Sequence, residues 1–377
     1  MGTRVLDVDL LRELQRKSGS EDPHAQYLLE RYAECQTEAL GGQILKCKAC
    51  GTRVVHYNPC NVRGCPKCAA YHQGRWRRAM HERILPVGHQ HVVFSGPGWL
   101  AQLWLKRPKA VMDALFAAAS AAVKTTVTAD GLCYAATMVF HSHGNRMCYK
   151  PHIHCLLAVG SLDDHDRWRE QRHLDEPGLR KRFDHRLLKR LERDVPEVLN
   201  QVIGHRGGQS SVHATYHEQT PDSIVAYLAG TTHGLVLKAK TVLEVGEHTV
   251  GYTAEHHGHR QRVELSHRDF LRRYLAHIPP HRSVTVRHYG LYATRHAEEL
   301  EQARQAIEAV PRQIDPPGEE ELFLPVCPHC HRRALIGQLE FEPHATPAEL
   351  RLLAIIRGSP VPHDTIITAA PSAVPIG

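Results

Sequence analysis

Two cysteine pairs near the N-terminal end constrain what this chain can fold into more than any other feature. Cys47 and Cys50 form the first pair, Cys65 and Cys68 form the second, and 14 residues lie between the pairs. Two C-x-x-C pairs at this spacing are typical of a structural zinc site, in which four thiolates close a tetrahedron. Gly51 suits the tight turn after the first pair. We therefore predict that Cys47, Cys50, Cys65 and Cys68 bind one Zn²⁺.

The remaining cysteines leave other zinc ligand sets open. Cys35 and Cys60 lie in the same N-terminal region, and either could replace a ligand of the predicted site. Cys327 and Cys330 form a further C-x-x-C pair far downstream. If this C-terminal pair folds back onto the N-terminal region, the eight cysteines would fill two four-cysteine sites. In a reducing cytoplasm such close spacing indicates metal binding and not disulfides.

A pair of histidines in an apolar run is the second candidate metal site. His152 and His154 flank Ile153, and the run continues through Leu156 and Leu157. Because successive side chains of a strand alternate faces, the two imidazoles would project side by side. Such a pair leaves coordination positions open on a divalent ion such as Mg²⁺ or Mn²⁺, which can polarise a phosphate. The chain has 30 histidines, so the pair indicates function only through what accompanies it.

Tyr227 is the candidate nucleophile. Asp222 and Ser223 follow a proline and predict the start of a helix, whose next residues are small or apolar apart from Tyr227. A phenol with a pKa of about 10 is a poor nucleophile at neutral pH, so it would need a metal to draw charge off a phosphate. Taken alone, this segment favours a tyrosine packed in the core among its apolar neighbours. The histidine pair is what changes that interpretation.

The basic balance of the chain permits a nucleic-acid partner. The formal net charge is +7 and the isoelectric point is about 8.8, and a phosphate backbone is recognised by charge that clusters. Arginines cluster in the segments 75–78, 260–262, 268–273 and 282–295. The aromatic side chains of Trp76, Tyr149 and Tyr289 could stack on unpaired bases for about 1–3 kcal/mol each. Alternatively, each basic cluster is a solvated helix face.

The sequence predicts neither secretion nor a membrane partner. The first residues lack the apolar core of a signal peptide. No stretch approaches the roughly 20 apolar residues that span a bilayer. We expect a soluble, intracellular protein.

The pattern of residues divides the chain into four regions. Residues 1–86 are expected to form a helical and zinc-binding domain, and residues 87–265 a domain of strands and helices that holds the histidine pair. Residues 266–342 should form a basic helical region with the last cysteine pair, and residues 343–377 a flexible tail rich in Pro and Ala. Strands are expected at 91–94, 133–141, 152–159, 210–216, 235–237 and 249–252, and helices at 109–123, 163–199 and 266–277.

Several motifs follow one another in an order that is more specific than any of them alone. The zinc knuckles precede a strand His-Val-Val-Phe-Ser, the run Phe140-His141-Ser142-His143-Gly144, the run from Tyr149 to His154, then Ala226-Tyr227-Leu228 and Arg287-His288-Tyr289-Gly290-Leu291. This order resembles that of rolling-circle transposases of the insertion sequence 91 family. These are HUH single-strand endonucleases, named for histidine, hydrophobic residue, histidine. The resemblance covers roughly residues 30 to 335.

The resemblance implies a fold, a reaction and a partner. The fold is α+β, a central antiparallel sheet flanked by helices, with the histidine pair on a middle strand, the tyrosine on a facing helix and an N-terminal zinc-binding domain. The reaction is metal-assisted attack by the Tyr227 hydroxyl on a DNA phosphodiester, which leaves a 5′-phosphotyrosine and a free 3′-hydroxyl. The cofactors would be structural Zn²⁺ and catalytic Mg²⁺ or Mn²⁺. The partner would be single-stranded DNA of transposon ends, in a prokaryotic cytoplasm and associated with the nucleoid.

A third ligand to the catalytic ion is expected, because two histidines hold such ions poorly. His141 ends the strand before that of His152 and is the first choice, and His233 beyond Tyr227 is the second. The residues expected to contact DNA are Arg75, Arg77, Arg78, Tyr149, Lys150, Arg287 and Tyr289.

The chain departs from the resemblance at one position that bears on the mechanism. Many members carry a second tyrosine one helical turn after the first, where residues four apart share a face. Thr231 occupies that position here, and the run from Thr231 to Gly234 lacks an arginine found in relatives. A single tyrosine could still cleave and transfer strands by sequential use.

Two other functions remain open. A zinc-dependent DNA-binding protein without nuclease activity would explain the knuckles and the basic clusters. A nucleotide hydrolase of the histidine-triad kind would need a third histidine where this chain has Leu156.

Overall fold

The computed structural model describes residues 2–19, 21–127, 133–144, 146–163, 165, 167–170, 173–203, 208–217, 222–233, 235–237, 241–256, 259–279, 283–307, 327–332, 335–341 and 343–344. The flexible tail expected at 343–377 therefore lies outside the described residues, apart from its first two positions.

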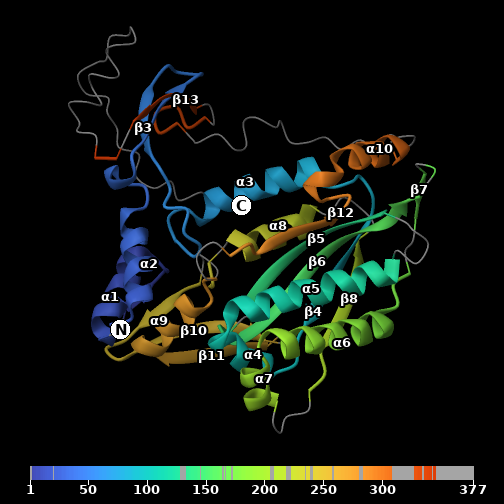
Figure 1. Ribbon diagram of the computed structural model, residues 1–377. Helices are drawn as coiled ribbons and strands as arrows, with labels where there is room; N and C mark the ends of the chain where they lie inside the picture. The colour runs from blue at the N-terminus through green and yellow to red at the C-terminus, as the bar shows by residue number, and fades with distance from the viewer. Residues whose placement is uncertain are drawn as a thin grey trace.

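An antiparallel sheet forms the centre of the molecule (Figure 1). Its strand order is β12-β5-β6-β4-β8, and the short β7 pairs with β6. The strands are β4 (His89–Ser95), β5 (Cys133–His143), β6 (Tyr149–Leu162), β7 (Trp168–Arg169), β8 (Ser211–His217) and β12 (Val286–Gly290). Since β6 pairs with β5 on one side and β4 on the other, the predicted histidine strand lies in the middle of the sheet.

The two faces of β6 meet different surroundings, as its alternating side chains require. Ile153 and Cys155 point to one face, where the largest buried apolar cluster joins the sheet to a layer of helices (Figure 1). These helices are α4 (Leu100–Lys106), α5 (Pro108–Val127), α6 (Glu176–Asp194) and α7 (Pro196–Ile203). Leu156 points to the opposite face, together with both histidines.

Helix α5 corrects one expectation from the sequence. By length and composition it could cross a membrane, although no stretch of the sequence was expected to do so. In the structure its apolar residues, including Val111, Leu115, Phe116 and Ala119, are buried in the main core. We therefore interpret α5 as a core helix, because its apolar surface is already covered by the sheet and by α6.

Two helices cover the face of the sheet that carries the histidines. They are α3 (Ala69–Arg83) and α8 (Asp222–His233), and α8 packs against both α3 and β5 (Figure 1). Met80 of α3, Leu228 of α8 and Val139 of β5 meet in one buried cluster. The helix that carries Tyr227 is thus held between α3 and the sheet.

The N-terminal helices pack against elements that lie more than 200 residues later in the sequence. Asp7 and Asp22 cap α1 (Val8–Ser18) and α2 (Pro23–Glu34), and Ser266 caps α9 (His267–Ala276). These helices share a buried cluster with a second sheet, made of β1 (Gly2–Arg4), β9 (Leu243–Val245), β10 (Thr249–His256) and β11 (His259–Ser266). Residues from the expected regions 1–86, 87–265 and 266–342 therefore share one buried cluster.

A small third sheet, two 3-10 turns and one further helix complete the described fold. Strands β2 (Gly42–Cys47), β3 (Arg53–Tyr57) and β13 (Leu335–Phe341) form this sheet, which lies beside the N-terminal helices (Figure 1). The 3-10 turns are Glu38–Leu40 and Thr294–His296, and α10 (Ala297–Ile307) covers one end of the central sheet. The predicted α+β class, with antiparallel sheets flanked by helices, is confirmed.

Two expected elements are wrong. Of the helix expected at 163–199, the part from Glu176 onward is helical, but none of the described residues before it is. The Asp163 carboxylate instead accepts hydrogen bonds from the amides of His165 and Arg167 and closes a turn before β7. Residues 235–237 form a bend and not a strand. Their apolar side chains pack into the core around the N-terminal helices, which accounts for the apolar pattern without strand pairing.

His89, at the start of β4, makes stability depend on pH. Its Nδ1 donates to the Val87 carbonyl and its Nε2 accepts from the Tyr292 hydroxyl, each at 2.8 Å. Burial lowers the pKa of His89 from 6.5 to about 4. Between pH 6.5 and about 4, His89 is protonated in the unfolded chain but neutral in the folded chain. The free energy of unfolding therefore falls as the pH drops below about 6.5.

We expect this one group to cost about 2 kcal/mol of unfolding free energy between pH 7 and pH 5. Urea unfolding of the wild type and of His89→Gln at both pH values measures it, because the variant lacks the titrating group. Equal losses in the two proteins would contradict the assignment.

Candidate active site and metal centres

Three histidines meet on the α8 face of the central sheet. His141 of β5 and His152 of β6 are register partners, and His154 follows on the same face of β6. One ligand nitrogen from each lies within 4.8 Å of the others, and all three side chains are buried. We call His141, His152 and His154 the histidine cluster. The structure thus brings the first-choice third ligand beside the predicted pair.

Hydrogen bonds orient each imidazole of the histidine cluster. Nδ1 of His152 donates to the Lys150 carbonyl at 2.5 Å, which leaves its Nε2 lone pair free, 3.0 Å from Nε2 of His154. Nε2 of His141 donates to the Thr231 carbonyl at 2.9 Å, which leaves Nδ1 free. Bonds of this kind from the second ring nitrogen are the usual support of metal-bound histidines.

The protonation state of the histidine cluster also suits a metal. Burial lowers the pKa of His152 to about 4, and it lowers the pKa values of His141 and His154 well below their ordinary range. The imidazoles are therefore neutral near pH 7, as metal ligation requires. A separation of about 3.0 Å is also the edge of an octahedron with metal–ligand bonds of about 2.1 Å. The residues present therefore fit a divalent ion.

Tyr227 lies over this cluster. Its ring centroid is 5.6 Å from that of His154, and 52% of the residue is exposed. Its apolar neighbours Ile224 and Leu228 are buried against the sheet and α3, so the tyrosine is on the open side of α8 and not in the core. Partial burial raises the pKa of Tyr227, so its hydroxyl keeps its proton at neutral pH.

His91 is a neighbour that the sequence did not single out. Its Nε2 lies 2.9 Å from Nδ1 of His154, and its ring centroid is 6.0 Å from that of Tyr227. It therefore orients His154 and borders Tyr227, the predicted nucleophile. The run His-Val-Val-Phe-Ser marked a strand that begins with His91, and this was the signal available in the sequence. The pairing of His91 with Leu156, which places its side chain on the face of the histidines, comes from the structure.

The second-choice ligand is not part of the histidine cluster. His233, the last residue of α8, packs near His72 and Trp76 of α3, with ring centroids 6.1 and 6.4 Å away. Thr231 lies nearer, and its hydroxyl donates to the Leu228 carbonyl while its own carbonyl accepts from His141.

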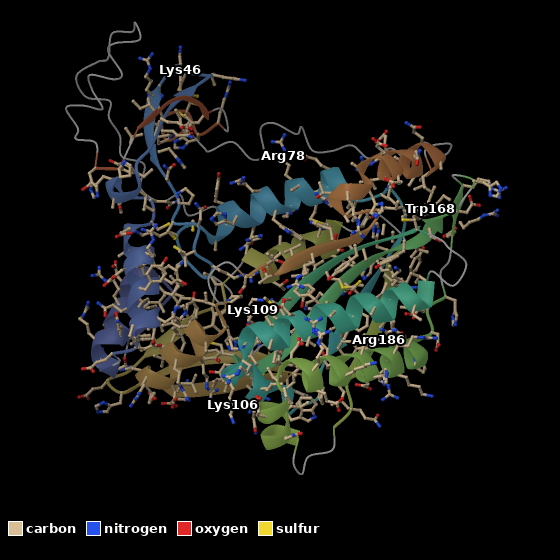
Figure 2. The ribbon with its side chains drawn as sticks, viewed as in Figure 1. Lys46, Arg78, Lys106, Lys109, Trp168 and Arg186 are labelled. Carbon is tan, nitrogen blue, oxygen red and sulfur yellow. The ribbon has the colours of Figure 1, made fainter. Side chains whose placement is uncertain are left out.

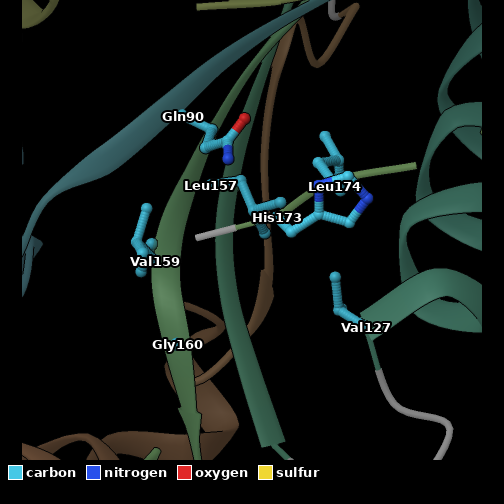
Figure 3. Close-up of a pocket in the computed structure, with 8 residues that line it drawn as sticks. Gln90, Val127, Leu157, Val159, Gly160, His173 and Leu174 are labelled. Carbon is cyan, nitrogen blue, oxygen red and sulfur yellow. The ribbon is translucent and has the colours of Figure 1, made fainter. Parts of the chain in front are cut away.

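Two pockets differ in their relation to this site. One adjoins the histidine cluster and is lined by residues including Arg63, His141, His143, Thr231 and His277. The other lies on the α5 face of the sheet, lined by residues including Gln90, Gly160 and His173 (Figure 3). The three groups of metal-ligating side chains found among the described residues lie elsewhere.

The cysteines form two clusters, as in the two-site alternative from the sequence, and not the single site of Cys47, Cys50, Cys65 and Cys68. Cys35, Cys60, Cys65 and Cys68 form one, here called the Cys35 cluster, and Cys47, Cys50, Cys327 and Cys330 form the other, the Cys47 cluster. The two C-x-x-C pairs of the N-terminal region therefore belong to different clusters, and each cluster gains its other two cysteines from outside these pairs. The reason for the second set is the pairing of β13 with β2, which brings the C-terminal pair to the first knuckle.

Sulfur distances in both clusters match zinc. They are 3.8 Å between Cys60 and Cys68, and 3.7 Å both for Cys47 with Cys330 and for Cys50 with Cys327. A tetrahedron with Zn–S bonds of about 2.3 Å has edges of about 3.8 Å.

The charge state of the Cys35 cluster points the same way. A sulfur hydrogen bond from Cys35 lowers the pKa of Cys60, whereas the same neighbour raises the pKa values of Cys65 and Cys68. The thiols therefore cannot all ionise without a cation among them, and a divalent ion would supply that charge.

The residues expected to contact DNA divide between two faces. Arg75, Arg77 and Arg78 are exposed on α3, where Arg78 projects outward (Figure 2). Lys150 is exposed near the start of the histidine strand. Tyr149, the first residue of that strand, is half-buried against the main core, with its ring centroid 4.9 Å from that of His277.

Two others lie on the far face. Arg287 of β12 pairs with Asp113 at 2.5 Å and stacks over Phe116 of α5. Tyr289 packs against the main core on the same side. The structure does not bring Arg287 and Tyr289 to the histidine cluster, because alternation on β12 turns them toward α5.

Two protein-family models match separate parts of the chain. One, described as "Transposase zinc-binding domain", matches residues 9–96, which contain six of the cysteines. The other, described as "Putative transposase", matches residues 135–299, which contain the histidine cluster and Tyr227.

Two curated proteins are similar over most of their length. The chain is 27% identical over 342 residues, 80% of this chain and 86% of the relative, to a Sinorhizobium fredii protein named "Putative transposase y4qJ". It is 27% identical over 296 residues, 69% of this chain and 68% of the relative, to the "Transposase for insertion sequence element IS801" of Pseudomonas savastanoi pv. phaseolicola. No solved structure matches the chain significantly.

Proposed function

Since the chain belongs to the insertion sequence 91 family of transposases and carries an N-terminal zinc-binding domain, we propose that it cleaves and rejoins single-stranded DNA with Tyr227 as the nucleophile. The observation that carries the proposal is the half-exposed Tyr227 ring beside His154, over three buried and neutral histidines. Such a set is suited to hold a divalent ion against a phosphate that a hydroxyl attacks.

The proposed step exchanges one phosphodiester for another. The Tyr227 hydroxyl attacks phosphorus, the bond from phosphorus to the 3′-oxygen breaks, and the loss of the phenolic proton is balanced by protonation of the released 3′-oxygen, which becomes a 3′-hydroxyl. The DNA remains attached through a 5′-phosphotyrosine, so a 3′-hydroxyl can later reverse the step. The bound ion would draw charge off the non-bridging oxygens, while His91 and the Lys150 carbonyl hold the ligands in place.

The ligand chemistry favours one of the two expected ions. His141, His152 and His154 supply only imidazole, whereas Mg²⁺ prefers carboxylate, carbonyl and water oxygens. We therefore propose Mn²⁺ as the better catalytic ion and Mg²⁺ as the weaker one. Zn²⁺ in the cysteine clusters is structural.

The replacement of a second tyrosine by Thr231 shapes the proposed reaction. One nucleophile must serve both strand breaks in turn, since the Thr231 hydroxyl is engaged with the Leu228 carbonyl. The test is to incubate the full chain and Mn²⁺ with labelled single-stranded oligonucleotides tiled over the DNA that flanks its gene. A covalent protein–DNA band on a denaturing gel is expected. Binding without any such band would favour the DNA-binding protein without nuclease activity.

Metal analysis is expected to find two zinc ions per chain, one for each cysteine cluster. Cys330→Ser should reduce the count to one, because it removes a ligand of the Cys47 cluster only. Cys68→Ser should also leave one zinc and should lower the melting temperature more, since the Cys35 cluster is embedded in a large apolar core. Emission spectrometry and thermal unfolding measure both effects.

The exposed Cys148 provides the matched control. It belongs to neither cluster, so Cys148→Ser should retain two zinc ions. A wild-type content of one zinc per chain would contradict the two-site arrangement.

A further inference from the structure

Arg63 joins the loop of the Cys35 cluster to the helix that carries Tyr227. It lies between Cys60 and Cys65, and its guanidinium donates through Nε and Nη2 to the Thr232 carbonyl at the end of α8, with an Nε–O distance of 2.5 Å. The last carbonyls of a helix lack amide partners within it and carry the negative end of its dipole, so a guanidinium is favourable there.

The backbone of this loop is held from two other helices. The Tyr32 hydroxyl of α2 donates to the Arg63 carbonyl, and the Tyr274 hydroxyl of α9 donates to the Gly64 carbonyl, each at 2.7 Å. Gly64 has φ +78°, and a Cβ there would lie 3.0 Å from the Tyr32 hydroxyl oxygen, so the turn requires glycine. Arg63 therefore projects from a fixed support.

Two adjacent backbone carbonyls of α8 accept hydrogen bonds, one from the histidine cluster and one from the loop of the Cys35 cluster. The Thr231 carbonyl accepts from His141 of the histidine cluster, and the Thr232 carbonyl accepts from Arg63 beside the Cys35 cluster. Tyr227 precedes Thr231 by one helical turn. The same helix also packs against α3, which begins directly after Cys68.

We propose that Arg63 is a positioning residue, which fixes the height and rotation of α8 so that the Tyr227 hydroxyl meets the phosphate held over the histidine cluster. This inference rests on the proposed function of Tyr227. The Cys35 cluster, when filled with zinc, shapes the loop from which Arg63 reaches. The competing role for Arg63 is a contact with a DNA phosphate. In that role its loss would weaken DNA binding and would leave the rate of the chemical step unchanged.

Arg63→Met in the full chain separates these roles, because it keeps the length of the side chain and removes its donors. With Mn²⁺ and the tiled oligonucleotides, we expect single-turnover adduct formation to slow by about 10- to 100-fold. The Kd for the same oligonucleotides should stay within about threefold, because phosphate contacts are unchanged. Zinc content should be retained, and amide exchange in residues 222–233 should quicken. Arg63→Lys should recover part of the rate, since an ammonium can donate to the Thr232 carbonyl.

Arg31→Met is the matched control, because Arg31 pairs with Glu34 on α2 and touches neither site; it should behave as wild type. A wild-type adduct rate in Arg63→Met, or a loss of rate explained wholly by weaker DNA binding, would overturn the inference. If Arg63→Met does not fold, Tyr32→Phe removes only the hydroxyl that holds the Arg63 carbonyl. It should slow the adduct several-fold, and a wild-type rate there would equally overturn the proposal.

The exchange measurement needs no catalysis, so the two proposals can fail separately. Unchanged exchange in residues 222–233 of Arg63→Met would count against the positioning role even if adducts form. Adduct formation by Tyr227→Phe would instead count against the proposed function and would leave the exchange result standing.

Discussion

Tyr227→Phe is expected to abolish the covalent protein–DNA adduct while leaving DNA binding within about threefold of wild type. The substitution removes one oxygen from a half-exposed side chain and keeps the ring that lies 5.6 Å from His154. Without the hydroxyl no ester to phosphorus can form. The adduct is measured on denaturing gels with labelled oligonucleotides and Mn²⁺, and binding is measured by fluorescence anisotropy.

Tyr27→Phe is the control for this result. Tyr27 lies on α2 and is 45% exposed, so it loses a hydroxyl of similar accessibility away from the histidine cluster. It should form adducts at the wild-type rate. Cleavage by Tyr227→Phe would exclude Tyr227 as the nucleophile and would favour hydrolysis by a metal-activated water.

His152→Ala is expected to reduce metal-dependent cleavage by about a thousandfold or more, because removing one of three ligands both weakens the ion and misplaces it. Single-stranded DNA binding should survive, since it depends on phosphate contacts by Lys and Arg. Calorimetric titration with Mn²⁺ should show loss of the catalytic site, and zinc content should remain at two ions.

His248→Ala serves as the control, because this histidine is largely exposed on the turn before β10. It should retain both cleavage and Mn²⁺ binding. His152 is buried, so the melting temperature of the variant must be compared with that of wild type. A variant that unfolds would point to a structural histidine, and a folded variant that still binds Mn²⁺ would remove His152 from the ligand set.

The histidine pair and the tyrosine helix could be predicted because both follow from local rules. Alternation along a strand places His152 and His154 on one face whatever surrounds them, and the helix-start signal at Asp222 and Ser223 places Tyr227 on a helix. The exposure of Tyr227 did not follow from the segment, which taken alone favoured a tyrosine packed in the core. The place of Arg287 and Tyr289 could not be read in this way. Their basic and aromatic character suggested DNA contact, but the face of β12 depends on its register with β5, which turns both toward α5.

The sequence by itself determined which residues the proposed chemistry would use: thiolate pairs suited to zinc, an imidazole pair suited to a second metal, and a tyrosine near helix-start signals. These follow from residue types and spacings over a few positions, where the backbone period sets geometry. Only the tertiary structure decided the partners. It placed Cys330 beside Cys47, 283 residues away. It also placed His141, and not His233, beside His152 and His154, and it brought Arg63 to the end of α8. Such contacts depend on the pairing of distant strands and on the burial of apolar surfaces, and neither leaves a local mark in the sequence.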